Sequence, residues 1–246
     1  MQTSQVTVRT AADLSDSLLP PDPRTVAMTP IDPELMARLN ATLPSCRLQI
    51  SRLPLCPEIK LALLEPDLPQ GPLPHDEMLA VLNQPAYWAF CWASGQVLAR
   101  QLIKHPQEVR NKVIIDFGAG SGVVGIAAAL AGARRVICCD LDEDAQLACG
   151  VNAKLNSVHV EVFGDIDTIN IEADLLVAAD VLYDRDNLPL LDRLPDFARD
   201  VLVADSRIRH FTHPKYQRVG QANATTWPDL DEQKAFNEVK LYRLVR

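Results

Sequence analysis

The chain has 246 residues, of which 48% are hydrophobic and 23% are charged, so it can bury a core of ordinary size without disulfides or metals. Its net charge of −8 argues against a nucleic-acid-binding surface, and it is typical of an acidic soluble protein or of one with a cationic partner. No stretch resembles a membrane span, a secretory signal or a transit peptide, so we expect a cytoplasmic protein without a membrane partner.

Six cysteines are spread along the chain without a C-x-x-C pair and without a histidine at metal-ligand spacing. Cys138 and Cys139 stand in an apolar run, where a free thiol behaves as a small buried hydrophobe. We therefore expect reduced cysteines, no metal site and no catalytic thiol.

The first part of the chain is rich in proline, with 13 of the 18 prolines in residues 1–85. Residues 1–57 give only weak periodic signals, and we expect them to form a Pro-rich, partly irregular N-terminal extension. Within it, Asp32 and Pro33 are suited to the N-cap and the first position of a short helix over residues 33–43.

From residue 58 onward, short apolar runs alternate with segments of helical spacing. The expected elements are a strand over 58–64, a loop over 66–76, a helix over 94–105, a strand over 113–115, a helix over 122–131, a strand over 135–139, a helix over 143–156, strands over 158–163 and 175–179, a helix over 188–194, a strand over 201–204, a strand near 218–226 and a final strand over 236–245. This alternation predicts a doubly wound α/β sheet, in which a ligand binds beyond the carboxyl ends of the strands.

A glycine-rich turn follows the strand at 113–115, where Asp116 precedes Gly118, Gly120 and Gly122. Glycines allow a tight turn and let a ligand approach the backbone closely. The spacing departs from the dinucleotide fingerprint, and the carboxylate of Asp116 would repel a pyrophosphate. The turn therefore favours a ligand that carries an ammonium group and no phosphate.

Acidic residues follow the next three strands. Asp140, with Leu141 beside it, stands where an acid accepts hydrogen bonds from a ribose, and Asp165 stands where an acid could meet a base amine. Asp180 and Tyr183 follow the strand at 175–179. Any one of these acids could instead be a helix cap or a turn residue. Taken together, the four strand ends match the parts of S-adenosylmethionine.

The run over residues 116–122 resembles the first motif of class I, or seven-strand, S-adenosylmethionine-dependent methyltransferases. Three further stretches, 57–61, 87–96 and 180–184, resemble the electron-transfer-flavoprotein β-subunit lysine methyltransferases and their bacterial relatives. The stretch over 87–96 is the most specific, because it matches the Y-W-A-x-x-W-x-G-G-Q segment of that family.

The resemblance implies a mostly parallel, seven-stranded, Rossmann-like methyltransferase domain over residues 58–246, including a leading strand and the Trp-rich segment. The sequence departs from the family at Ser94, which stands where the family has glycine, and at residues 117–122, which read F-G-A-G-S-G in place of L-G-S-G-C-G. The 57-residue extension has no counterpart in the resemblance.

The resemblance also implies a reaction, in which an amine attacks the methyl group of the sulfonium. Asp180 could accept a hydrogen bond from the amine, and Tyr183 could line the channel. Trp88 and Trp92 could cover the cofactor or the lysine stem, although packing in the core is an equal alternative. These interpretations make Asp180 and Tyr183 the candidate catalytic residues.

Asp184 and Asp186 could attract a cationic substrate, or they could be part of a solvated loop. The expected function is N-methylation of lysines in a protein substrate, with the electron-transfer-flavoprotein β subunit as a candidate. A nicotinamide-like small-molecule N-methyltransferase, a non-catalytic S-adenosylmethionine-binding module and a nucleic-acid methyltransferase stay open as alternatives. The last is disfavoured because Val181 and Leu182 replace both prolines of a D-P-P-Y motif.

Overall fold

The computed structural model describes residues 30–67, 74–183, 185–208 and 211–245. The description below concerns the second of the chain's two units, Ile31–Arg246. Residues 1–29 of the expected extension, residues 68–73 of the expected loop and Asp184 lie outside the described residues.

The second unit begins with a helix and a hairpin. Helix α1 (Pro33–Thr42) starts where the carboxylate of Asp32 accepts hydrogen bonds from the backbone N–H groups of Glu34 and Leu35, which confirms the predicted cap. Strands β1 (Leu48–Arg52) and β2 (Lys60–Leu64) then pair in antiparallel fashion. The strand β2 was expected, and β1 was not.

Two helices follow the hairpin. Helix α2 (His75–Asn83) was not expected, and its first turn takes up the last residues of the segment predicted as a loop. Helix α3 (Ala93–Lys104) confirms the helix predicted over residues 94–105. The Trp-rich segment between them contains the short 3₁₀ helix η1 (Tyr87–Ala89).

The remaining strands form one sheet of seven, in the order β5-β4-β3-β6-β7-β9-β8. Its members are β3 (Val113–Phe117), β4 (Arg135–Cys139), β5 (Glu161–Phe163), β6 (Leu175–Ala179), β7 (Val201–Asp205), β8 (Tyr216–Asn223) and β9 (Glu238–Leu244). Strands β3 to β7 are parallel, and β9 runs antiparallel to both of its neighbours. The doubly wound, mostly parallel sheet predicted from the sequence is thereby confirmed.

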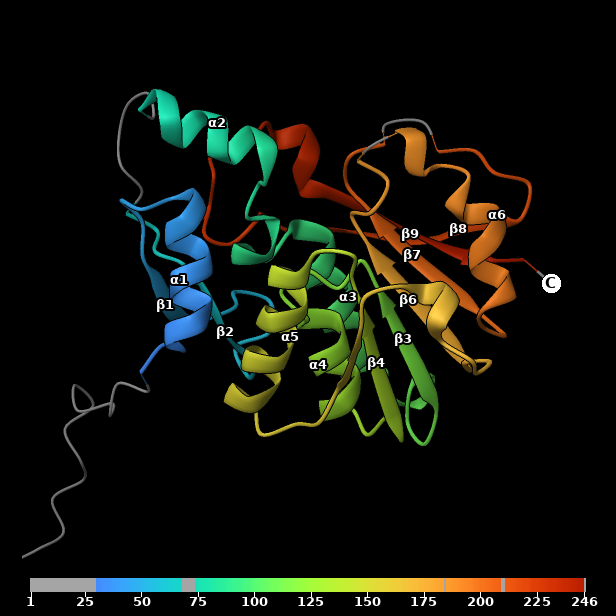
Figure 1. The fold of residues 1–246 in the computed structure, drawn as a ribbon. Helices are drawn as coiled ribbons and strands as arrows, with labels where there is room; N and C mark the ends of the chain where they lie inside the picture. Colours follow the sequence, from blue (N-terminus) through green and yellow to red (C-terminus); the bar gives the residue numbers. More distant parts are fainter. Residues whose placement is uncertain (1–29, 68–73, 184, 209–210, 246) are drawn as a thin grey trace, which may run out of the picture. The chain divides into compact units, whose positions relative to one another are not determined.

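Helices cover both faces of this sheet, as Figure 1 shows. They are α4 (Val123–Leu130) and α5 (Glu143–Leu155), which pack with α3 on one face, and α6 (Leu190–Arg193) on the other. The short 3₁₀ helices are η2 (Pro106–Glu108), η3 (Ile166–Thr168), η4 (Arg185–Asn187), η5 (Leu194–Asp196) and η6 (Lys234–Asn237). The central strands are buried on both faces, which explains their continuous apolar runs. All six cysteines are buried free thiols, as predicted for Cys138 and Cys139.

The β1–β2 hairpin is fixed to α5 by side-chain amides. The backbone N–H groups of Lys60 and Ala62 donate to Asn156 and Asn152 over 2.9 and 2.8 Å, and Asn156 donates back to the Lys60 carbonyl. The hairpin, α1 and α5 share a separate core cluster. The domain boundary expected at residue 57 stays a prediction, and α1 and β1 lie in the same compact unit as the sheet.

Within the described ranges, no helix is long and apolar enough to span a membrane.

Candidate functional site

The glycine turn after β3 is packed on one side and open on another. Gly118, Gly120 and Gly122 all have positive φ angles, of 66°, 52° and 77°. A Cβ atom at Gly118 would lie 2.5 Å from a methyl group of Val181, whereas a Cβ atom at Gly120 would meet no atom within 4 Å. The turn therefore needs glycine at Gly118 for packing and leaves room for a ligand at Gly120.

Asp116 lies buried beneath this turn. Its Oδ2 accepts a 2.7 Å hydrogen bond from the N–H of Gly125, in the first turn of α4. Burial raises the pKa of Asp116 to about 7, and the charge of Asp140 adds to this, against the effect of the hydrogen bond from Gly125. The carboxyl group is therefore easily protonated near neutral pH unless a cation lies close to it.

Asp140, after β4, lies directly against the glycine turn. Its Oδ2 accepts a 2.8 Å hydrogen bond from the N–H of Gly120, and its Oδ1 accepts one of 3.1 Å from the N–H of Asp142. Burial raises its pKa above the usual value. The next side chain, Leu141, is 83% exposed and offers an apolar surface beside the open turn. The structure thus brings Gly120, Asp140 and Leu141 together as the sequence predicted.

Asp165, after β5, is exposed and caps a short helix. Its Oδ1 accepts a 2.9 Å hydrogen bond from the N–H of Asp167 at the start of η3. This geometry is the capping arrangement that the sequence left open for the strand-end acids. A role toward a base amine stays a prediction for Asp165.

Asp180, after β6, is buried and joins three elements. Its Oδ1 accepts hydrogen bonds from the Ser94 hydroxyl at 2.6 Å and from the N–H and hydroxyl of Ser206 at 3.0 and 2.9 Å. Its Oδ2 accepts a 3.0 Å hydrogen bond from the N–H of Ser94. The backbone of Asp180 has a positive φ of 52°, a conformation that costs free energy in a residue other than glycine. The four donors hold the carboxylate in this strained position.

Three aromatic rings come from segments close in sequence to Asp180 or to its partner Ser94, and they form one cluster. The ring of Tyr87 lies 5.8 Å from that of Trp92 and 5.6 Å from that of Tyr183. The indole N–H of Trp92 donates a 3.0 Å hydrogen bond to the Tyr87 carbonyl, which fixes its orientation. Trp88 is only 1% exposed and packs in the core cluster of α1, the hairpin and α5, so it is separated from this surface.

Ser206 and Arg207, after β7, were not among the predicted site residues. The Arg207 guanidinium lies 5.2 Å from the ring of Trp92 and 4.6 Å from that of Phe236, and it pairs with both carboxylate oxygens of Glu232. The other site residues were predicted because they directly follow a strand. The polar residues after the strand at 201–204 could have been found in the same way. Asp186 is exposed in η4.

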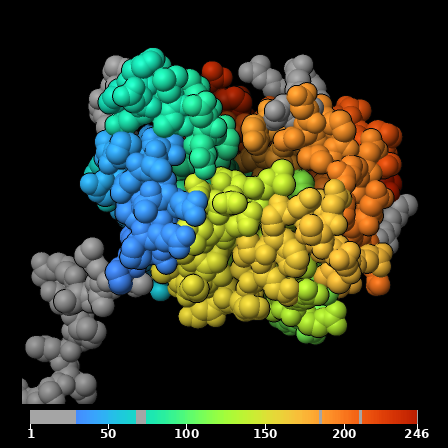
Figure 2. Space-filling model, viewed as in Figure 1, coloured from blue at the N-terminus to red at the C-terminus, as the bar shows by residue number. Residues whose placement is uncertain are grey.

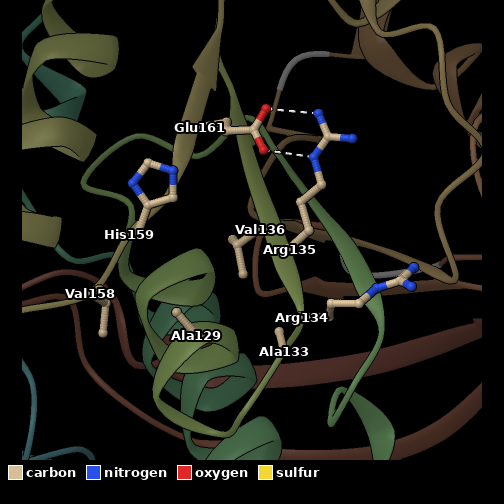
Figure 3. Close-up of a pocket in the computed structure, with 8 residues that line it drawn as sticks. All are labelled: Ala129, Ala133, Arg134, Arg135, Val136, Val158, His159 and Glu161. Carbon is tan, nitrogen blue, oxygen red and sulfur yellow. Dashed lines mark hydrogen bonds and ion pairs between the residues drawn. The ribbon is translucent and has the colours of Figure 1, made fainter.

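Figure 2 shows that α2, α5 and the segment after β6 are exposed on one face of the second unit. A shallow pocket lies elsewhere, at the amino ends of β4 and β5 (Figure 3). Arg135 and Glu161 line this pocket and form a bidentate ion pair, with nitrogen–oxygen distances of 2.6 and 2.7 Å. Because the glycine turn and the acids lie at the opposite ends of the strands, we do not assign the chemistry to this pocket.

Comparison with known proteins places this chain among methyltransferases. A family model described as "Ribosomal protein L11 methyltransferase (PrmA)" matches residues 97–185. The electron transfer flavoprotein beta subunit lysine methyltransferase of Xenopus laevis is 35% identical over 176 residues, which cover 65% of this chain and 68% of that protein.

The protein of the same description from Homo sapiens is 35% identical over 144 residues, so the match spans 54% of this chain and only half of the human relative. Among solved structures, the magnesium protoporphyrin IX methyltransferase of Synechocystis with bound SAM aligns with a TM-score of 0.49 and 15% identity, over 72% of this chain and 86% of that one.

Proposed function

This chain belongs to the family of the electron transfer flavoprotein β-subunit lysine methyltransferases, and from this premise we propose that it transfers methyl groups from S-adenosylmethionine to lysine side chains of a protein. The observation that carries the proposal is the open glycine turn at Gly120, held against the carboxylate of Asp140. This arrangement lies within the stretch that matches the methyltransferase family model.

The residues at the turn fit S-adenosylmethionine. Gly120 leaves space for the ligand, Asp140 has lone pairs left to accept hydrogen bonds from a ribose, and the exposed Leu141 suits the face of an adenine. The buried carboxylate of Asp116 would act through its charge, from beneath the turn, on the ammonium group of the methionine part. When bound, the cofactor supplies a methyl group that is activated on a sulfonium sulfur.

The side chains around Asp180 would receive the lysine. Oδ2 of Asp180 accepts one hydrogen bond from the described residues and can accept a second from the substrate amine. The rings of Tyr87, Trp92 and Tyr183 would stabilise the cationic forms of the amine before and after transfer. We assign Asp180 and Tyr183 to contact with the substrate and Trp92 to the wall of its channel.

The amine must lose its proton before it attacks, which costs roughly 4–5 kcal/mol at pH 7 for a lysine of ordinary pKa. A positive charge close to the amine favours its neutral form. Alignment of the lone pair with the methyl group then supplies most of the remaining help, because the site holds both partners in one geometry.

The proposal is tested with purified chain, labelled S-adenosylmethionine and two purified acceptor proteins, the electron transfer flavoprotein β subunit and ribosomal protein L11. These are the acceptors in the descriptions of the relatives and of the family model. We expect label on lysine residues of one of them. Label on a small amine from a metabolite mixture, and on neither protein, would support the small-molecule alternative instead.

The cytoplasmic location that we infer from the sequence is part of the same proposal. The six buried free thiols are consistent with a reducing compartment.

A further inference from the structure

Helix α2 is an apolar helix without a buried side. Its nine residues are all described, and none of them is buried. Met78 and Leu79 are each 43% exposed, and Leu82 is 71% exposed. Among the described residues, two side-chain hydrogen bonds tie this helix to its surroundings, from Ser45 to Glu77 and from Gln84 to Asp144. Helix α2 therefore packs on its surroundings without placing a fully buried side chain in a core.

Exposed apolar side chains recur along the sequence between α2 and the candidate active site. Tyr87 is exposed four residues after the end of α2, and its ring lies 5.6 Å from the exposed ring of Tyr183. We call Met78, Leu79, Leu82, Tyr87 and Tyr183 the apolar patch. Among the described residues, these five are nearly half of the eleven large apolar side chains that are exposed. Such clustering is typical of an interaction surface.

The chain segment that carries four of the five residues of the apolar patch is acidic in composition. Residues 61–99 contain no lysine and no arginine, but they contain Glu65, Asp67, Asp76 and Glu77. Asp76 is exposed in the first turn of α2. A partner that binds here with complementary charge therefore carries basic residues.

The length of α2 and the acidic charge of its segment distinguish three candidate ligands of the apolar patch: a small molecule, a second copy of this chain and a basic protein. A nine-residue helix is roughly 13 Å long, which is more than one amine-bearing small molecule needs. A second copy of this chain would bring the same acidic segment against the first, and the like charges would repel each other. A basic protein surface satisfies both conditions.

We propose that the apolar patch is the docking surface for the methyl-accepting protein, which presents an apolar area ringed by basic residues next to its target lysine. This inference rests on the proposed function and adds the chemistry of the partner's surface to it. The contact between Tyr87 and Tyr183 links the docking surface to the active site, so a docked protein delivers its lysine toward Asp180.

The test compares Met78→Glu and Leu82→Glu with Leu130→Glu, using whichever of the flavoprotein β subunit and L11 accepts label. Leu130 is a matched control because it is 43% exposed, like Met78, but lies at the end of α4. For the protein substrate we expect each patch variant to raise KM by about tenfold or more, with kcat within roughly twofold of the parent. Cofactor affinity and the rate with a short lysine peptide should be unchanged.

The dependence of KM on ionic strength provides a second test of the docking surface. KM for the protein substrate should rise with ionic strength in the parent, and this dependence should weaken in Asp76→Asn. An unchanged protein KM in both patch variants, or an equal loss with the short peptide, would overturn the docking surface. A parent chain that labels neither protein would instead overturn the proposed function, and the docking inference with it.

Discussion

The hydroxyl of Ser94 donates a 2.6 Å hydrogen bond to the carboxylate of Asp180, across 86 positions of the chain. The bond joins the amino end of α3 to the end of β6, and Ser206 adds the end of β7 to the same carboxylate. Ser94 stands at a position where the family segment has glycine. This chain therefore holds its candidate catalytic acid with a donor that the glycine could not supply.

Removing that hydroxyl should loosen Asp180. Ser94→Ala keeps the backbone N–H bond but loses the hydroxyl, so we expect it to lower the free energy of unfolding by about 1–2 kcal/mol and to lower kcat. Ser51→Ala is the matched control, because Ser51 has a buried hydroxyl without a hydrogen-bond partner. Urea unfolding and single-turnover rates measure both effects. Equal behaviour of the two variants would contradict the importance of the Ser94 bond.

The glycine turn should tolerate a methyl group at one position and not at another. Gly120→Ala meets no atom, so we expect it to fold with a cost of about 1–2 kcal/mol from the left-handed backbone and to lose cofactor affinity. Gly118→Ala would clash with Val181 and should cost more stability. Gly150→Ala, in α5 with equal free space, is the control. Calorimetric titration with S-adenosylmethionine measures the cofactor affinity of each variant. Normal binding by Gly120→Ala would show that the cofactor does not bind at this turn.

Substitution of Trp88 should affect mainly stability, whereas substitution of Trp92 should affect mainly activity. Trp88→Phe leaves a space in the core, so it should lower the free energy of unfolding by about 1–2 kcal/mol and leave kcat/KM of the folded fraction unchanged. Trp92→Phe loses the hydrogen bond to Tyr87 and should lower kcat/KM by about tenfold with a smaller loss of stability. Thermal unfolding and steady-state kinetics of both variants test this, and the reverse pattern would exchange their roles.

The raised pKa of Asp116, about 7 against an ordinary 3.8, makes a prediction about stability and pH. Ionisation is harder in the folded chain, so Asp116 contributes stability below about pH 4 that is lost as the pH rises through 7. Asp116→Asn keeps an oxygen that can accept from Gly125 but does not ionise. Its stability relative to the parent should therefore rise by more than about 1 kcal/mol between pH 4 and 8. The free energies of unfolding of parent and variant are measured at each pH. A constant difference between them from pH 4 to 8 would contradict a buried carboxyl with a raised pKa.

The same group predicts how cofactor binding depends on pH. A bound ammonium favours the ionised carboxylate, so binding to the parent should release roughly half a proton at pH 7 and should tighten as the pH rises from about 6 to 8. Asp116→Asn should bind more weakly and show neither effect. Calorimetry in buffers of different ionisation enthalpy counts the protons. A proton count that is identical in parent and variant would separate Asp116 from the ammonium.

The strands that carry the site could be predicted because they are continuous apolar runs bounded by polar residues. The runs over residues 135–139 and 175–179 match β4 and β6 at both ends. Since parallel strands end at one edge, the acids after them could be expected to lie together, and Asp140 indeed binds the turn at Gly120. The register of the neighbouring strands then placed Asp180 at the same edge.

Other features depend on contacts that no local pattern encodes. Helix α2 buries none of its residues, so its sequence has no core-facing stripe to detect. Trp88 is in the core because α1 and the hairpin cover it, and two of these elements, α1 and β1, belong to a segment with weak periodic signals. The donors from Ser94 and Ser206 reach Asp180 only after three separate elements have packed.

The hairpin carries a consequence for the behaviour of the protein at high concentration. An unpaired strand edge is a template on which another chain can add a strand and begin to aggregate. On β2, the N–H groups of Lys60 and Ala62 are already engaged by Asn156 and Asn152. The two side-chain amides occupy N–H groups of β2 that an incoming strand would need for pairing. Helix α5 therefore protects this edge of the hairpin from self-association.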